Sequence, residues 1–305
     1  MIIEKYNTTD DDNFEIGIFG LGYESRSISC FSQVKDRCRM KLALAYNYWC
    51  DKADYKINKE EFESNDCRVI EVDENAIRKD LELNLAQIIQ EIKGKVFVDI
   101  SVMTRHRLSE LLWFLFENMI SESSIIIAYS IADFVEPPTQ NYPVKFFGSI
   151  IDSFQPLTGR LNLHPIVVIG LGYEKDKALG AIGHLDPENV IFLIPSNEKE
   201  QNYKERLDEN NKLLFDNYPK SKSLTYDVLK PYSTYFELKS LILRLKKEHR
   251  ILLIPLGPKI LAVISLIIAW EFSPEINVWR VSSEQLEKPL NRKSSGEYIY
   301  IKINI

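Results

Sequence analysis

Short apolar runs alternate along the chain with longer segments whose apolar residues recur at helical spacing. In the first half this pattern predicts five strands, each followed by a helix or a loop. The strands are expected at residues 14–19, 41–46, 68–72, 95–100 and 124–129. The helices are expected at residues 25–34, at residues 75–92 and from about Thr104 onward. Strands that alternate with helices predict an α/β fold with a mainly parallel sheet.

The second half repeats this order of elements. Its strands are expected at residues 165–169, 190–194, 223–228, 250–255 and 276–281, with a further edge strand at Glu297–Ile303. Its helices are a short one after the first strand, then residues 234–247 and 259–272. We therefore expect two tandem Rossmann-like units related by a pseudo-twofold axis. They would span residues 1–150 and 151–305, with a linker rich in Pro and Gly at residues 141–164.

One pentapeptide occurs in both halves. Gly20-Leu21-Gly22-Tyr23-Glu24 and Gly170-Leu171-Gly172-Tyr173-Glu174 are identical and lie 170 − 20 = 150 positions apart. Each follows the first strand of its half and precedes a helix. The glycines allow a tight turn there, and the tyrosine at a strand end can present its ring to a base. The repeat predicts equivalent turns, either as plain entries into a helix or as parts of a ligand site.

The ends of the fourth strands carry a second repeated feature. Ligands of open α/β sheets bind at the carboxyl ends of the strands, and Arg105 and Lys259 follow the fourth strands, 259 − 105 = 154 positions apart. Each is expected in the first turn of the next helix. A base there opposes the helix dipole, which favours a bound anion that the base and the helix end share.

The candidate site residues follow from these two turns. The ligand-binding candidates are Gly20, Gly22, Tyr23, Arg26, Ser101, Thr104, Arg105, Gly170, Gly172, Tyr173, Gly257 and Lys259. Helix capping is an equally good role for Ser101 or Thr104.

The catalytic candidates are Glu24 and Glu174. Each could be a general base or nucleophile, or only a dipole partner at a helix start. Arg26 would in that case neutralise Glu24. No His, metal cluster or second carboxylate repeats beside them, so binding is expected to be the primary activity.

Composition narrows the classes of function. The net charge is −6 and the pI about 5.5, which argues against a general nucleic-acid-binding surface. The longest apolar run, residues 260–270, is too short to span a membrane, and the acidic start does not fit a signal peptide. Four cysteines without a CxxC pair indicate reduced thiols and a cytoplasmic protein. The spacing of the histidines predicts no metal site, and no cofactor is expected.

The strand-four motifs carry a resemblance to a known family. Asp99-x-Ser101-x-x-Thr104-Arg105 and Leu256-Gly257-Pro258-Lys259 resemble the pattern of CARF (CRISPR-associated Rossmann fold) domains. The tandem arrangement is similar to that of SAVED domains in bacterial antiphage systems. The resemblance implies binding of a phosphorylated nucleotide, of the cyclic oligonucleotide type, by a sensor or regulatory subunit. Because the two repeats occupy the chain, it also implies a separate protein effector as partner.

Two alternatives stay open at this point. One is an enzyme on nucleotides, either a ring-nuclease-like phosphodiesterase or an N-glycosidase that uses Glu24 or Glu174. The other is a structural subunit of a defence complex.

Overall fold

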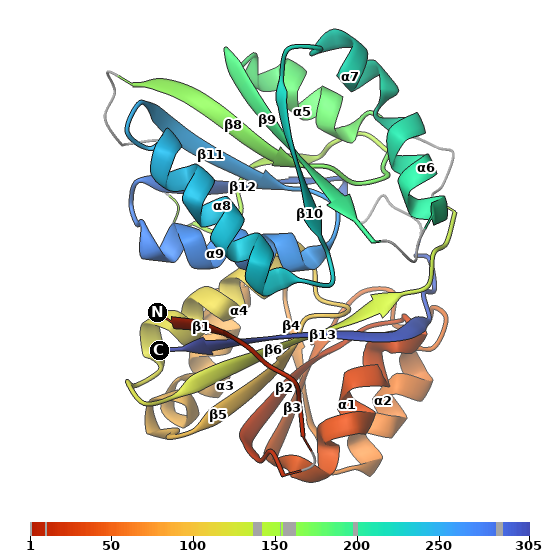
Figure 1. Cartoon of the computed structure of the whole chain (residues 1–305). Coiled ribbons are helices and arrows are strands. Elements are labelled where there is room, and N and C mark those ends of the chain that lie inside the picture. Colours follow the sequence, from red (N-terminus) through yellow and green to blue (C-terminus); the bar gives the residue numbers. More distant parts are fainter. Residues whose placement is uncertain are drawn as a thin grey trace. The chain divides into compact units, whose positions relative to one another are not determined.

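The chain folds into two compact units. The computed structural model describes residues 2–9, 11–136, 142–152, 154, 163–197, 201–284 and 289–305 (Figure 1). The first unit comprises Met1–Asp133 and Pro289–Ile305, and the second comprises Phe134–Lys288. Each contains one mainly parallel sheet with helices. This confirms the expected α/β class and the two Rossmann-like units.

The first sheet has the strand order β1-β13-β6-β5-β2-β3-β4. Its parallel strands are β2 (Phe14–Leu21), β3 (Cys38–Tyr46), β4 (Arg68–Val72), β5 (Lys95–Asp99) and β6 (Ser124–Ala132). Its antiparallel strands are β13 (Ser294–Asn304) and β1 (Ile2–Lys5). Its helices are η1 (Ser25–Ile28), α1 (Ser29–Val34), η2 (Lys35–Arg37), α2 (Tyr55–Ser64), α3 (Ile77–Glu91) and α4 (Arg105–Asn118).

The second sheet has the order β10-β9-β8-β11-β12-β7. Its parallel strands are β8 (His164–Gly170), β9 (Asn189–Ser196), β10 (Lys222–Asp227), β11 (His249–Pro255) and β12 (Ile276–Ser282), and β7 (Phe146–Ser149) is antiparallel. Its helices are α5 (Lys177–Leu185), α6 (Gln201–Asn210), α7 (Lys212–Asn217), α8 (Pro231–Leu245) and α9 (Lys259–Glu271). Both units thus place their parallel strands in the order third, second, first, fourth, fifth.

The antiparallel strand next to each fifth strand comes from an unexpected part of the chain. Residues Glu297–Ile303 lie in β13, which pairs with β6 and β1 of the first sheet and is not an edge strand. β7 lies inside the predicted linker and pairs with β12 of the second sheet. A division at residue 150 therefore differs from the two compact units at both places. The apolar alternation of β13 predicts a strand, but pairing with a distant segment leaves no local signal.

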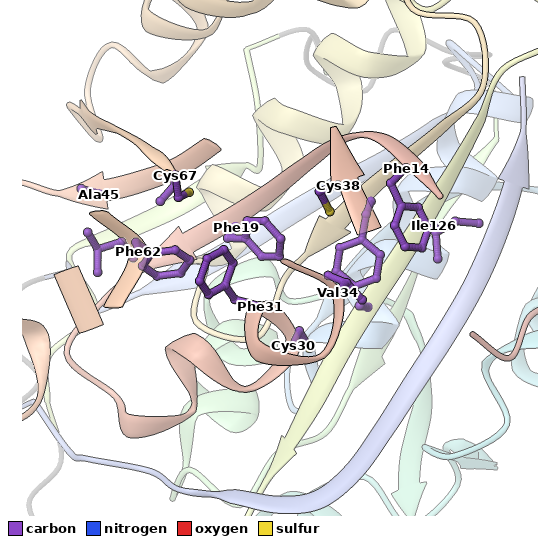
Figure 2. Packing of buried hydrophobic residues seen from close by; sticks show 14 of the residues in the cluster. Phe14, Phe19, Cys30, Phe31, Val34, Cys38, Ala45, Phe62, Cys67 and Ile126 are labelled. Atoms are coloured by element: carbon purple, nitrogen blue, oxygen red, sulfur yellow. The ribbon is translucent and has the colours of Figure 1, made fainter. Parts of the chain in front are cut away.

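The central parallel strands β2, β5, β8 and β11 are buried on both faces, as their continuous apolar sequences predict, whereas the edge strands β4 and β10 also carry exposed residues. One face of the first sheet packs on α1 and α2 through a cluster of aromatic residues (Figure 2). The Phe31 ring centre lies 4.5 Å from that of Phe62 and 5.1 Å from that of Phe19. This packing fixes α1 and α2 over the carboxyl end of β2, where the repeated turn begins.

No helix in the described part of the chain is long and apolar enough to cross a membrane.

Candidate functional site

Both repeated turns lie at the switch point of their sheets. β2 is adjacent to β5, and β8 is adjacent to β11, so the turns after the first and fourth strands meet at the same sheet edge. Gly20 pairs within β2 with Leu44, and Gly170 is the last residue of β8, paired with Leu193. The two pentapeptides therefore begin at corresponding strand ends, where open α/β sheets bind ligands.

A buried asparagine holds the repeated turn in each unit. Asn58 Nδ2 donates hydrogen bonds of 2.9 Å to the carbonyl oxygens of Gly22 and Glu24. Asn211 Nδ2 donates one of 2.8 Å to the Gly172 carbonyl. The two asparagine residues are 1% and 2% exposed, and both follow the second strand of their sheet. Sequence reasoning missed this pair because the spacings differ, 58 − 22 = 36 against 211 − 172 = 39.

In the first unit a serine also closes the turn. The Gly22 N–H donates to Ser27 Oγ at 3.3 Å, and Ser27 Oγ donates to the Gly20 carbonyl at 2.8 Å. The second unit has Lys177 at the corresponding position, 27 + 150 = 177. Although the pentapeptides are identical, the side chains available to form hydrogen bonds with their backbone therefore differ.

Glu24 is engaged inside the first unit. Its carboxylate forms an ion pair of 2.7 Å with Arg26 and lies 3.5 Å from an Arg292 nitrogen, and its side chain is 9% exposed. Arg26 also donates to the Ser130 carbonyl at 2.9 Å. Burial disfavours the charged guanidinium, but Glu24 and Tyr129 outweigh this and raise the pKa of Arg26. Neutralisation of Glu24 by Arg26 is thus confirmed. The burial of Arg26 gives no support to a ligand contact.

The end of β5 is occupied by a buried polar cluster. Asp99 Oδ1 accepts hydrogen bonds from the Ser101 N–H at 2.9 Å and from Ser101 Oγ at 2.5 Å. Ser101 Oγ in turn accepts from the Ser130 N–H at 2.8 Å. Burial raises the pKa of Asp99. Ser101 is completely buried and ties β5 to β6, so it neither caps α4 nor reaches the surface.

The cap of α4 is the other predicted candidate. Thr104 precedes the helix, and its Oγ1 accepts from the Arg107 N–H at 3.0 Å. The capping role expected of Thr104 is therefore confirmed.

Arg107 is a buried base that sequence reasoning missed. Its guanidinium donates to the Leu44 carbonyl at 3.1 Å and to the Val72 carbonyl at 2.9 Å, and it pairs with Glu74 at 2.8 Å. It lies 3.6 Å from the centre of the Tyr46 ring. Arg107 thus joins the carboxyl ends of β3 and β4. Arg107 is the third residue of α4 and follows two other basic residues, so its sequence context does not single it out.

Large side chains fill the switch point of the first unit. A Cβ added at Gly22 would lie 3.6 Å from Val102 and 3.7 Å from the Tyr46 ring. One added at Gly20 would lie 3.0 Å from Val102 and 3.1 Å from Met103. The repeated turn is therefore covered by side chains from the ends of the second and fourth strands.

Both backbone and side chains surround the glycines of the second unit. A Cβ added at Gly170 would collide with the Leu261 side chain, and one added at Gly172 would lie 3.0 Å from the Glu174 carboxylate. Gly257 has a φ of +74°, and a Cβ there would collide with the Leu171 carbonyl oxygen. A Cβ at Gly172 would lie 3.1 Å from the Gly257 Cα. The register places Pro195 of β9 at the position that Tyr46 holds in β3, because Gly20 pairs with Leu44 and Gly170 with Leu193. The two turns of the second unit thus meet glycine to glycine.

The two aligned bases begin their helices, as predicted. Arg105 is the first residue of α4 and Lys259 the first residue of α9, and both are half-buried. The helix starts differ in their caps. Thr104 caps α4 with its hydroxyl, whereas Pro258 precedes α9 and makes no side-chain cap.

Glu174 differs from Glu24 in its exposure. It forms an ion pair of 3.0 Å with Lys177, and its side chain is 37% exposed against 9% for Glu24. The same pentapeptide therefore carries a carboxylate that is enclosed in one unit and accessible in the other.

The two tyrosines also differ in their neighbours. Tyr23 is half-buried and packs against the core cluster of the first unit. Tyr173 is half-buried and lies beside the rings of Phe134 and Tyr203.

Among the residues that the structure describes, no group of three or more His, Cys, Asp or Glu side chains could hold a metal ion. Comparison of the chain with models of protein families finds no matching family, and comparison with curated proteins finds no significant match.

Proposed function

We propose that the chain binds a phosphorylated small molecule at the switch point of the second sheet. The observation that carries this proposal is the contact between Gly172 and Gly257, next to a helix that begins at Lys259. The glycines bring the turn after β8 and the start of α9 together at the edge where doubly wound folds bind ligands. The positive end of α9 and the lysine ammonium together favour an anion there.

The first unit has a different role in this proposal. Its corresponding edge is filled by Tyr46, Val102 and Met103, and its charged groups pair with one another. It supplies a stable partner fold, and ligand binding belongs to the second unit.

The resemblance to CARF and SAVED domains suggests which ligands to test first. Cyclic oligonucleotides are the first ligands to test. The corresponding biological role is that of a sensor or regulatory subunit of an antiphage system, which acts on a protein effector. Binding is favoured over catalysis because Glu24, one of the two repeated carboxylates, is enclosed with Arg26. Glu174 is the accessible one, so an enzymatic alternative would depend on it.

Calorimetric titration with cyclic oligonucleotides, mononucleotides and inorganic phosphate tests the proposal. Lys259→Ala should weaken binding of the phosphorylated ligand by about 1.5–3 kcal/mol, the range for a hydrogen bond to a charged group. Arg105→Ala is the matched control, because Arg105 holds the same helix position in the first unit. It should leave affinity almost unchanged.

Two outcomes would contradict the proposal. Equal losses of affinity in both variants would mean that the ligand binds elsewhere or in both units. Unchanged affinity in Lys259→Ala would show that Lys259 does not hold a phosphate. Chromatography of each ligand after incubation with the protein separates binding from turnover. Products that disappear in Glu174→Gln would replace the binding role by the enzymatic one.

A further inference from the structure

Tyr173 belongs to a small aromatic group at the repeated turn of the second unit. Its ring centre lies 5.2 Å from that of Tyr203 at an interplanar angle of 82°, and 6.3 Å from that of Phe134 at 73°. Asn210 Nδ2 donates a hydrogen bond of 2.5 Å to the Tyr173 carbonyl. Two edge-to-face neighbours and a bonded backbone therefore fix the ring.

The ring lies close to the proposed phosphate site. Tyr173 directly follows Gly172, which contacts Gly257, and Lys259 is two residues beyond Gly257. Consecutive Cα atoms are about 3.8 Å apart, so the Cα of Lys259 is no more than about 8 Å from that of Gly257. One small ligand can therefore contact both the turn and the helix start.

The first unit shows that the pentapeptide alone does not require such an aromatic group. Tyr23 occupies the same position in its turn and packs against the core cluster of the first unit. Tyr173 is half-buried like Tyr23, but its ring lies against Phe134 and Tyr203. The same position of the pentapeptide therefore carries a tyrosine with different neighbours in the two units.

We propose that Tyr173 is the platform on which the base of a nucleotide ligand stacks. This inference rests on the proposed phosphate site and identifies the rest of the ligand as a planar aromatic base. Aromatic side chains bind bases of any sequence through their π faces. A ring that Tyr203 and Phe134 already hold loses little conformational freedom when the base binds, because its rotamer is fixed in advance.

Titrations with three probes separate the base from the phosphate: inorganic phosphate, ribose 5-phosphate and adenosine 5′-monophosphate. The wild-type protein should bind the nucleotide at least about tenfold more tightly than ribose 5-phosphate, as stacking of one base predicts. Tyr173→Ala should abolish this difference, Tyr173→Phe should retain it, and inorganic phosphate should bind all three proteins equally. Tyr23→Ala is the matched control and should keep the full preference.

The outcomes distinguish this inference from the function on which it rests. Equal affinity of the wild-type protein for the nucleotide and ribose 5-phosphate, or a full preference in Tyr173→Ala, overturns the base platform while the phosphate site stands. Failure of all three probes to bind, or binding that does not depend on Lys259, overturns the phosphate site itself.

Discussion

The two copies of the repeated turn share their sequence and their place in the sheet but not their surroundings. In both, the turn leaves the first strand of a sheet with the same strand order, and a buried asparagine amide bonds the second glycine carbonyl. In the first unit, Glu24 pairs with the buried Arg26, and large side chains cover the glycines. In the second unit, Glu174 is partly exposed, Gly172 meets the backbone of Gly257, and the Leu261 side chain covers Gly170.

This difference separates the part of the repeat that the two units share from the part in which they differ. The pentapeptide and its asparagine define the turn in both units. The residues at the ends of the second and fourth strands differ between the units, and our proposal assigns ligand binding to the second unit on this difference. The differences are Tyr46 against Pro195, and Val102 with Met103 against Gly257.

The largest expected effect comes from the buried charge of the first unit. Arg26→Leu removes the nearest ion-pair partner of the buried Glu24 carboxylate, and should lower the free energy of unfolding by about 3–5 kcal/mol. The matched variant Lys177→Leu removes the partner of a carboxylate that is partly exposed to water. It should cost no more than about 1 kcal/mol.

Denaturant unfolding of both variants measures this contrast. Losses of similar size would show that the two turns are enclosed to the same degree, against the difference described above.

The asparagine amides should matter equally in the two units. Asn58→Leu removes the donor of the Gly22 and Glu24 carbonyls and Asn211→Leu that of the Gly172 carbonyl, and each variant should cost about 1–3 kcal/mol in the unit concerned. Hydrogen exchange resolved by residue follows the stability of each unit separately. A loss confined to one unit would mean that the turns are not held in the same way.

The smallest expected effect is a pH dependence confined to the first unit. Asp99 is completely buried, and burial raises its pKa above the ordinary value of 3.8. A carboxyl group with a raised folded-state pKa stabilises the fold at low pH, and this contribution is lost as the pH rises through that pKa. The register places Ile254 at the corresponding position of the second sheet, because Ile18 pairs with Val98 and Val168 with Leu253.

Unfolding measured from pH 4 to pH 8 tests this assignment. The stability of the wild-type protein should fall relative to Asp99→Asn as the pH rises, by at most about 1.4 kcal/mol per pH unit for one proton. A difference that stays constant or changes in the opposite sense would show that Asp99 is ionised in the folded state throughout.

The sequence was most informative where a strand carries its own signal. β4 was predicted at Arg68–Val72, as observed, because a short apolar run between polar segments marks a buried parallel strand. The starts of α4 and α9 were also located, and Thr104 and Pro258 directly precede these two helices. Local composition decides these features.

Long-range pairing and buried polar contacts were not accessible in the same way. The partners of β13 lie more than 100 residues away in β6, and the sequence of β13 does not indicate which strand it pairs with. α2 was missed because only Tyr55, Asn58 and Phe62 of its residues are buried, which is a weak amphipathic pattern. Arg107 satisfies carbonyls at the ends of two strands, and that requirement exists only after the sheet has formed.

Hydrogen–deuterium exchange with and without a bound nucleotide tests the central claim most directly, namely that only the second unit's switch point binds ligand. The expected result is slower exchange in residues 170–174 and 257–261 and no change in residues 20–24 and 101–107. Protection of both sets, or of the first set alone, would contradict the division of roles between the two turns.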